Sequence, residues 1–287
     1  MIVVFGSTGT VGRQVVTGLV AAGRRVRAIT RDPARASFDA AVEVVRADIT
    51  EPGSVLAAVE GADAVYMATA PDALAHERTV ADAVRRTGTG RVVKLSSVAA
   101  LPPVLDSYGA AHAAGERAFA ESGAGWTVLR SAGFMSNVLQ WGWSIQSAGA
   151  VYQPYGMVPR ALIAPEDVAA AAVVCLTTHG HDGKTYQLTG PEALTGPEQT
   201  ERVAAAIGRP LRFVDADPEQ ARQGMIGAGM PEDLTDGLLA SMADRDPRRG
   251  GTPLPTVREL TGRPPTRFET WLAEHVGELA PAETPAG

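Results

Sequence analysis

The sequence has one cysteine, few aromatic residues and only two lysines among its 287 residues. The lone thiol, Cys175, excludes an internal disulfide and fits a reducing compartment. The net charge is -6, and arginine supplies almost all of the positive charge. This balance argues against a nucleic-acid surface, which needs clustered cations. Long apolar runs are missing too: VAAAAVVCL at 168–176 is far too short for a membrane span, so we expect no membrane contact.

Several functional signals are also missing. Met1 runs directly into an apolar stretch without the charged region of a secretory leader, so we expect a cytoplasmic protein. No Gly-x-Ser-x-Gly or Ser/His/Asp signature supports hydrolysis. With 45% hydrophobic residues the chain can bury a large core, and we expect disorder only at AETPAG, 282–287. We expect no metal, because carboxylates and cysteines do not stand at ligand spacing around the other histidines, His76, His179, His181 and His275.

The most informative stretch that is present is MIVVFGSTGTVG at 1–12. A short apolar run breaks into glycines at every third position, and a helical pattern follows. A strand, a tight glycine turn and a helix N-terminus together form a binding site for a pyrophosphate. The spacing is GxxGxxG rather than the commoner GxGxxG, and a purely steric turn is the alternative. The residues expected at the phosphates are Gly6, Thr8, Gly9, Thr10, Val11 and Gly12.

Apolar strands and helices alternate through the first two thirds of the chain. Strands are predicted at 26–30, 42–45, 64–67, 91–95, 126–129 and 185–188, with helices at 52–59, 73–86, 109–121 and 168–177. This alternation predicts an α/β Rossmann fold with a doubly wound parallel sheet. We expect a cofactor-binding domain at 1–150, completed by about 163–190. A smaller, mainly helical capping lobe is expected at 191–287, with short helices at 197–207, 218–226, 231–243 and 255–260.

Ligands of such sheets bind at the carboxyl ends of the strands. Steric packing is the alternative for the small residues there, and a turn cap is the alternative for Asp48. The cofactor contacts expected at these strand ends are Arg31, Asp48, Ile49, Ala68, Thr69, Ala70, Ser96, Ser97, Gly133 and Phe134.

The residue that follows the second strand predicts the choice of cofactor. Arg31 stands 19 residues beyond Gly12, where an acid binds the ribose of NAD and an arginine binds the 2′-phosphate of NADP. Asp32 is the alternative and would take the NAD role, but it precedes Pro33, and we expect it to cap a short helix there. A solvated loop cation is the remaining alternative for Arg31. We therefore expect NADP(H).

The helix predicted from Gly109 carries the candidate catalytic residues. Tyr108, His112 and Glu116 follow one another at four-residue intervals, and so lie near one face of this helix. Ser96 and Ser97 end the strand before it. A strand end with serine followed by a helical pair resembles the proton-transfer arrangement of short-chain dehydrogenase/reductases, which carry Tyr-x-x-x-Lys. His112 and Glu116 fall at these two places, with Tyr108 as an alternative acid.

The chain as a whole resembles the NmrA-like branch of atypical short-chain dehydrogenase/reductases. The resemblance rests on GSTGTVG at 6–12, TRDP at 30–33, RADIT at 46–50, KLSSVAA at 94–100, HAAGE at 112–116, WTVLRSAGFMSNVL at 126–139 and IAPEDVAAAA at 163–172. It continues through GKTYQLTGPEALT at 183–195 and VRELTGRPPTRFETWL at 257–272. The branch includes NADPH-dependent quinone reductases, azoreductase-like proteins and redox-sensing regulators. The missing Tyr-x-x-x-Lys means that catalysis is not inherited with the fold.

The resemblance implies an NADPH-dependent oxidoreductase that reduces a small apolar quinone, azo compound or conjugated ketone, in a biosynthetic pathway. Two alternatives stay open: a non-catalytic NADP(H) sensor that reports to a protein partner, and a non-redox isomerase or cyclase with His112 as base. A homodimer is also left open. An apolar substrate pocket is suggested by Phe134, Met135, Trp141, Trp143, Tyr152 and Tyr155, all of which could instead be core residues.

Overall fold

The computed structural model describes residues 1–104 and 106–279. The AETPAG segment, for which we expected disorder, lies outside these residues. The described chain forms a seven-stranded parallel sheet in the order β3-β2-β1-β4-β5-β6-β8. The strands are β1 (Ile2–Val4), β2 (Val26–Thr30), β3 (Glu43–Arg46), β4 (Ala64–Met67), β5 (Arg91–Ser97), β6 (Gly125–Ser131) and β8 (Lys184–Leu188).

The order of the strands places the ligand crevice. From β1 the chain builds outward through β2 and β3, and then returns to the other side of β1 with β4, β5, β6 and β8. The direction therefore reverses between β1 and β4, which is where open α/β sheets bind their ligands. The predicted Rossmann fold is confirmed.

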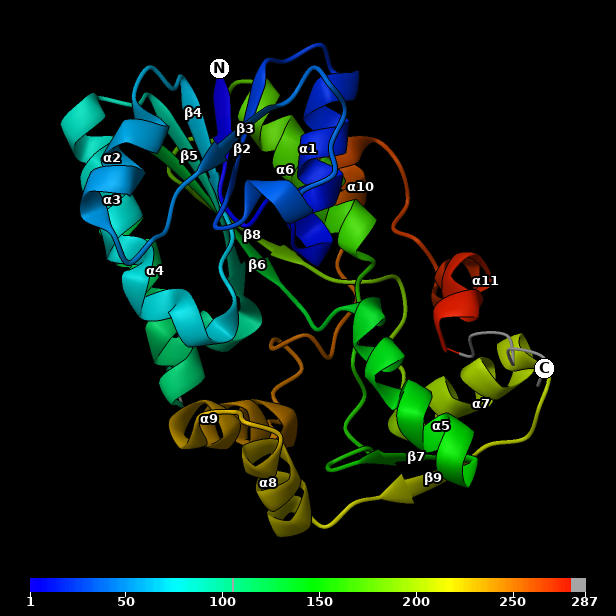
Figure 1. Cartoon of the computed structure of the whole chain (residues 1–287). Helices are drawn as coiled ribbons and strands as arrows, with labels where there is room; N and C mark the ends of the chain where they lie inside the picture. Colours follow the sequence, from blue (N-terminus) through cyan, green and yellow to red (C-terminus); the bar gives the residue numbers. More distant parts are fainter. Residues whose placement is uncertain (105, 280–287) are drawn as a thin grey trace.

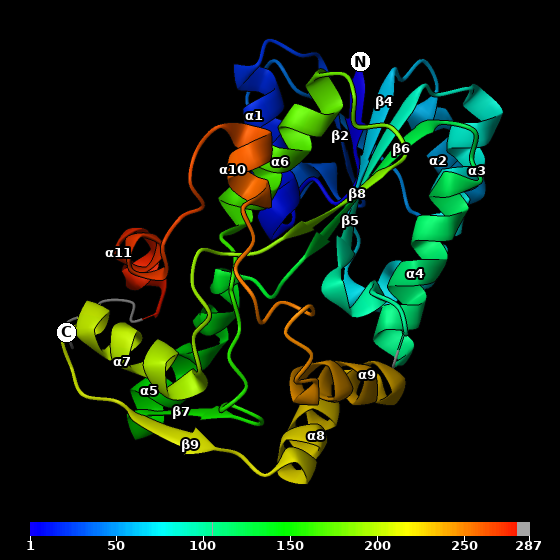
Figure 2. The same ribbon diagram turned by 180° about the vertical axis from the view of Figure 1, so that it is seen from behind.

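Helices cover both faces of the sheet (Figures 1 and 2). One apolar core lies under α2 (Pro52–Val59), α3 (Glu77–Thr87) and α4 (Ser107–Ala120). The opposite core lies under α1 (Thr10–Ala21), α6 (Pro165–Thr177) and α10 (Thr256–Thr261). The helix expected at 73–86 is divided into a 3₁₀ segment, Pro71–His76, and α3. No helix of the described ranges is long and apolar enough to cross a membrane.

A second part of the molecule has an apolar core of its own. It includes the buried side chains of Met135, Val151, Phe268 and Trp271. A two-stranded parallel sheet joins β7 (Ala150–Gln153) to β9 (Arg212–Asp215), and neither strand was among those predicted from the sequence. The helices around this core are α5 (Gly142–Ala148), α7 (Gly196–Ile207) and α11 (Phe268–Leu279). The chain thus enters this part near residue 134 rather than only after residue 190.

The remaining helices, α8 (Pro218–Gly227) and α9 (Glu232–Ala243), lie below α4 in Figure 1. Gly237 of α9 packs so closely on Ser107 and Tyr108 that a Cβ atom there would meet them within 3.0 Å. Two arginines attach the end of α9 and the segment that follows it to the rest of the chain. Arg160 donates to the carbonyls of residues 241, 242 and 244, and Arg249 donates to those of residues 98, 99, 101 and 103.

Candidate functional site

The glycine-rich turn joins β1 to α1 at the point where the strand order reverses. Gly6 has φ +69, and a Cβ atom on Gly6 would overlap the carbonyl of Ala68. A Cβ atom on Gly12 would overlap the carbonyl of Gly6. These two glycines are therefore needed for the turn and for the close approach of α1.

Gly9 is different, because it is exposed and its Cβ atom would meet only the Gly6 carbonyl, at 3.3 Å. It is the N-cap of α1, no side chain caps the helix there, and the first turn contains no acid. The first N–H groups of α1 are thus free to bind an anion, and their dipole favours a negative charge. Bare backbone at the helix N-terminus fits a dinucleotide pyrophosphate. Thr8 and Thr10 are exposed beside it, whereas Val11 is buried and can contribute only its backbone.

The residues that follow β2 and β3 lie on the next side of the predicted crevice. Arg31 is exposed at the end of β2, and Asp32 caps the 3₁₀ turn at Pro33 by accepting from the Ala34 N–H at 3.1 Å, as predicted. Asp48 accepts from the N–H and hydroxyl of Thr50, and these hydrogen bonds hold the pKa of its carboxyl below the usual value, aided by the charge of Arg31. One Asp48 oxygen thus serves as a turn cap, which was the alternative reading. Ile49 packs partly against the core under α2.

The segment that follows β4, residues 68–70, contacts the glycine turn directly. The Gly6 backbone lies against Ala68, and Thr69 is half-buried behind it. The Thr69 hydroxyl donates to Glu77 Oε1 at 2.7 Å, so its side chain points away from solvent. Ala70 is exposed at the rim. On the other side of the crevice, Gly133 is exposed after β6, and Phe134 pairs with Ile163 in a parallel bridge.

Ser97, Tyr108 and His112 form a cluster at the end of β5 and the start of α4. Tyr108 is the second residue of α4, so it lies inside the helix rather than before it. Burial raises the pKa of the Tyr108 phenol, and a hydrogen bond with Ser97 partly offsets this rise. The Tyr108 and His112 rings meet edge to face with centroids 4.7 Å apart. A serine at a strand end with Tyr-x-x-x-His on the next helix thus has the spacing of Tyr-x-x-x-Lys, one turn earlier than we had placed it.

His112 is buried, with 7% of its surface exposed, and neither ring nitrogen has a hydrogen-bond partner among the described residues. Burial, together with the nearby charge of Lys94, lowers its pKa to about 3. The imidazole is therefore neutral at pH 7. An unpartnered buried imidazole is uncommon, because such groups normally bind protein, water or ligand.

Glu116 is held by partners other than His112. Its carboxylate accepts two hydrogen bonds from the Arg130 guanidinium, at 2.9 and 2.6 Å, and one from the Ser96 hydroxyl at 2.6 Å. Ser96 is 2% exposed. Its side chain is thus engaged under α4, and only its backbone remains for a ligand. The sequence showed no signal for Arg130, since the pairing depends on β5 and β6 being neighbours in the sheet.

A second buried pair was also missed from the sequence. Lys94 and Glu77 are both fully buried, and the Lys94 ammonium lies 2.9 and 2.8 Å from the two Glu77 oxygens. Lys94 is one of only two lysines, and it stands in the middle of a strand that otherwise reads VV-LSS. A lysine amid an apolar strand is the signal that could have revealed it, because lysine is almost never fully buried unless it is paired.

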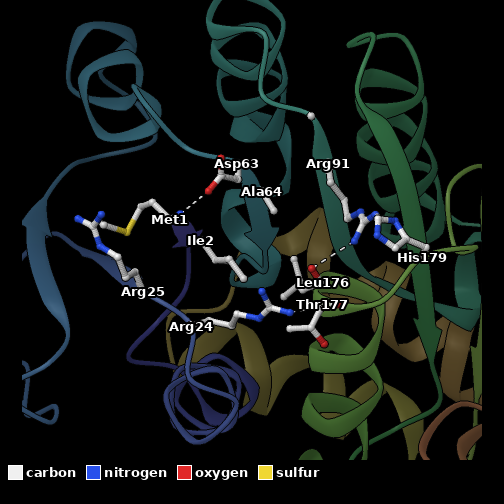
Figure 3. Close-up of a pocket in the computed structure, with 11 residues that line it drawn as sticks. Met1, Ile2, Arg24, Arg25, Asp63, Ala64, Arg91, Leu176, Thr177 and His179 are labelled. Carbon is white, nitrogen blue, oxygen red and sulfur yellow. Dashed lines mark hydrogen bonds and ion pairs between the residues drawn. The ribbon is translucent and has the colours of Figure 1, made fainter.

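A cavity of about 420 Å³ lies at the opposite, amino-terminal edge of the sheet (Figure 3). Arg24 donates to the Thr177 carbonyl at 3.3 Å, and Arg91 donates to those of Leu176 and Thr178 at 3.3 and 2.8 Å. Asp63 pairs with the amino group of Met1. The charged groups of this cavity thus cap the end of α6 and hold the chain start, far from the strand ends that form the crevice.

A parallel sheet with an exposed glycine turn at its point of reversal is the arrangement of a Rossmann protein with a dinucleotide-binding site. Residues 6–179 match the family model described as NAD(P)H-binding. The chain belongs to this NAD(P)H-binding family, and the resemblance to its NmrA-like short-chain dehydrogenase/reductase branch is confirmed. The expectation of a nicotinamide cofactor is confirmed with it.

Three relatives show how far the likeness extends. The chain is 38% identical to the (4-alkanoyl-5-oxo-2,5-dihydrofuran-3-yl)methyl phosphate reductase of Streptomyces griseus, covering 98% of this chain and 100% of the relative. It is 35% identical to the NAD(P)H azoreductase of Xenophilus azovorans, with 98% and 100% covered. Among solved structures, the NADPH complex of a quinone oxidoreductase from Escherichia coli matches with a TM-score of 0.81 and 25% identity, over 97% of this chain and 99% of that one.

Proposed function

We propose that the protein is an NADPH-dependent oxidoreductase that reduces a small, largely apolar quinone, azo compound or conjugated ketone. The whole-length relatives are named as reductases of a furanone phosphate and of azo compounds, which supports this class. The observation that carries the proposal is that the Ser97–Tyr108–His112 cluster accompanies a glycine turn whose exposed backbone can bind phosphate. The proposal includes action in the cytoplasm within a biosynthetic pathway, and it leaves assembly as a homodimer to be measured.

The proposed roles of the residues follow from their environments. Bound at the glycine turn, NADPH supplies the hydride. Tyr108 keeps its proton through neutral pH, because burial raises the pKa of its phenol, and it can donate that proton to a substrate oxygen or nitrogen. Ser97 lies close enough to lower the pKa of the phenol, and its proposed role is to orient that phenol. His112 is neutral, and its free nitrogens can accept from or donate to whatever lies in the crevice.

The substrate would enter from the side of the second part of the molecule. A hollow of about 160 Å³ lies between residues 157–160 and 244–251. A Cβ atom on Gly250 would lie against Ala132 and Val98, so this segment sits beyond the ends of β5 and β6. Met157, Val158 and Pro159 give the hollow an apolar side, whereas Asp244 and Arg245 make the other side polar. We therefore keep the division into a cofactor domain and a capping lobe, and add residues 134–163 to the lobe.

Stopped-flow mixing tests this proposal. Protein loaded with NADPH is mixed with 1,4-benzoquinone, menadione or methyl red, and loss of the nicotinamide absorbance is followed. Turnover with at least one acceptor is expected. If no acceptor oxidises NADPH while NADPH binds tightly, the enzyme proposal is wrong, and a sensor that binds NADP(H) without turnover is favoured.

The proton donor is tested with Tyr108→Phe and His112→Ala, and Tyr186→Phe is the control, since its phenol contacts His181 instead. We expect kcat to fall by roughly 10²- to 10⁴-fold for Tyr108→Phe, with the NADPH Kd unchanged. A smaller fall is expected for His112→Ala if it only positions Tyr108. A loss of less than about tenfold in both variants would mean that water supplies the protons.

A further inference from the structure

The Glu77–Lys94 pair lies between the cofactor crevice and α4. Both side chains are 0% exposed, and Lys94 also donates to the Leu95 carbonyl at 3.0 Å. Glu77 is the first residue of α3, where the helix dipole favours a carboxylate. A buried pair of this kind is weak evidence for stability, because desolvation of the two charges offsets their attraction. Its position therefore needs another explanation.

One side of the pair reaches the glycine turn. Thr69 donates to Glu77 Oε1, and its neighbour Ala68 is the residue against which the Gly6 backbone lies. The segment after β4 is thus fixed from behind by the Glu77 carboxylate and touches the phosphate turn in front. Without this hydrogen bond, the half-buried hydroxyl of Thr69 would lose its partner and the segment would be free to shift.

The other side of the pair supports α4. A Cβ atom on Gly115 would overlap Glu77 Oε2 and lie 3.0 Å from Lys94 Cε. The helix therefore rests directly on the pair, and only glycine permits this approach. His112 precedes Gly115 by three residues on the same helix, and the charge of Lys94 reaches its imidazole. The spacing between α4 and β5 at the proposed proton donor depends on this contact.

From these contacts we infer that Glu77 and Lys94 are positioning residues that hold the segment after β4 and helix α4 in register across the crevice. The inference rests on the proposed function for the role of α4, but its cofactor side depends on NADPH binding alone. Thr69→Val and Gly115→Ala test the contacts on the two sides of the pair, and neither substitution removes a buried charge.

On the cofactor side, Thr69→Val keeps the shape of the side chain and removes the donor, whereas Thr69→Ser keeps the donor. We expect the NADPH Kd of Thr69→Val to rise about 3- to 10-fold, since binding must then order the segment that the hydrogen bond had held. Thr69→Ser should restore most of the affinity. Fluorescence titration measures both. Equal Kd values for the valine and serine variants would overturn this half of the inference.

On the helix side, Gly115→Ala pushes α4 away from the pair. A displacement of about 1 Å at a catalytic group can cost on the order of 10²-fold, so we expect kcat to fall by roughly 10- to 100-fold while the NADPH Kd stays within about twofold. Gly53→Ala in α2 is the control, because a Cβ atom there meets nothing within 4 Å. Thermal melts report whether each variant folds.

The outcomes separate the inference from the proposed function. If wild-type protein binds NADPH but none of the acceptors oxidises it, the proposed function is wrong. The Thr69 variants then still test the cofactor side of the inference. If wild type turns over and Gly115→Ala turns over equally well, the positioning role on α4 is wrong. A Gly115→Ala variant that loses stability but keeps kcat would assign the contact to folding alone.

Discussion

We propose that Arg31, at the scale of one side chain, sets the preference of the crevice for NADP(H) over NAD(H). It is exposed at the end of β2, and its guanidinium can bind a 2′-phosphate through two charge-assisted hydrogen bonds. We expect Arg31→Ala to cost roughly 1.5–3 kcal/mol of NADPH affinity and to leave NADH affinity almost unchanged. Fluorescence titrations with the two cofactors measure this, with Arg85→Ala on α3 as the control. Equal losses for both cofactors would contradict the assignment.

His112 makes the stability of the protein depend on pH. Its pKa in the folded protein is about 3, against 6.5 in an unfolded chain, so below pH 6.5 the unfolded state binds a proton that the folded state does not. The free energy of unfolding therefore falls as the pH falls from 6.5 towards 3, by at most about 1.4 kcal/mol per pH unit from this group.

Urea unfolding at several pH values measures the effect, and His112→Gln is the comparison. We expect the difference in unfolding free energy between wild type and His112→Gln to shift steadily against wild type below pH 6.5. A constant difference between pH 7 and pH 4 would show that the imidazole protonates as easily in the folded protein as in the unfolded chain.

At the scale of elements, the turn between β1 and α1 is built from glycines with different duties. Gly6 and Gly12 are required by the fold, whereas Gly9 is exposed and a Cβ atom there would meet only the Gly6 carbonyl, at 3.3 Å. Gly9→Val should therefore leave the fold largely intact and abolish NADPH binding, because its branched side chain covers the free N–H groups. Circular dichroism and fluorescence titration check the two parts. Normal NADPH binding by this variant would mean that the phosphates lie elsewhere.

The elements of the Rossmann sheet could be predicted because glycine and proline mark their ends. The bounds of β2, α2 and β4 agree with the expected ones residue for residue. By contrast, β7 and β9 were missed because each pairs only with the other, across a long stretch of sequence. The positions of the candidate cofactor residues could be predicted together with the strands, because these residues stand at the strand ends. The partners of Glu116 and Lys94 could not, since they depend on which strand and helix lie side by side.

At the scale of the whole molecule, Arg249 ties the segment after α9 to the Rossmann sheet. It is 5% exposed, pairs with Asp244 at 2.8 Å and donates to four carbonyls after β5. Arg249→Met removes the ion pair with Asp244 and the side-chain hydrogen bonds to these carbonyls, so we expect a loss of about 3–5 kcal/mol. Urea unfolding measures it.

The neighbouring Arg248 offers a matched control. Its side chain is 68% exposed and pairs with Asp246 at the surface, so Arg248→Met should cost no more than about 1 kcal/mol. Similar losses for the two variants would contradict the view that Arg249 joins the two parts of the molecule. Folded Arg249→Met should also bind NADPH normally while its KM for the acceptor rises.

The packing of α6 on α1 has a consequence for synthesis on the ribosome. The face of the sheet under α2, α3 and α4 is covered by helices that all precede residue 121, so it can close early. The opposite face carries only α1 until residues 165–177 emerge as α6, and α10 follows still later. The nascent chain therefore has one closed face and one open apolar face for much of its translation, and chaperones that hold growing polypeptides would bind on the side of α1.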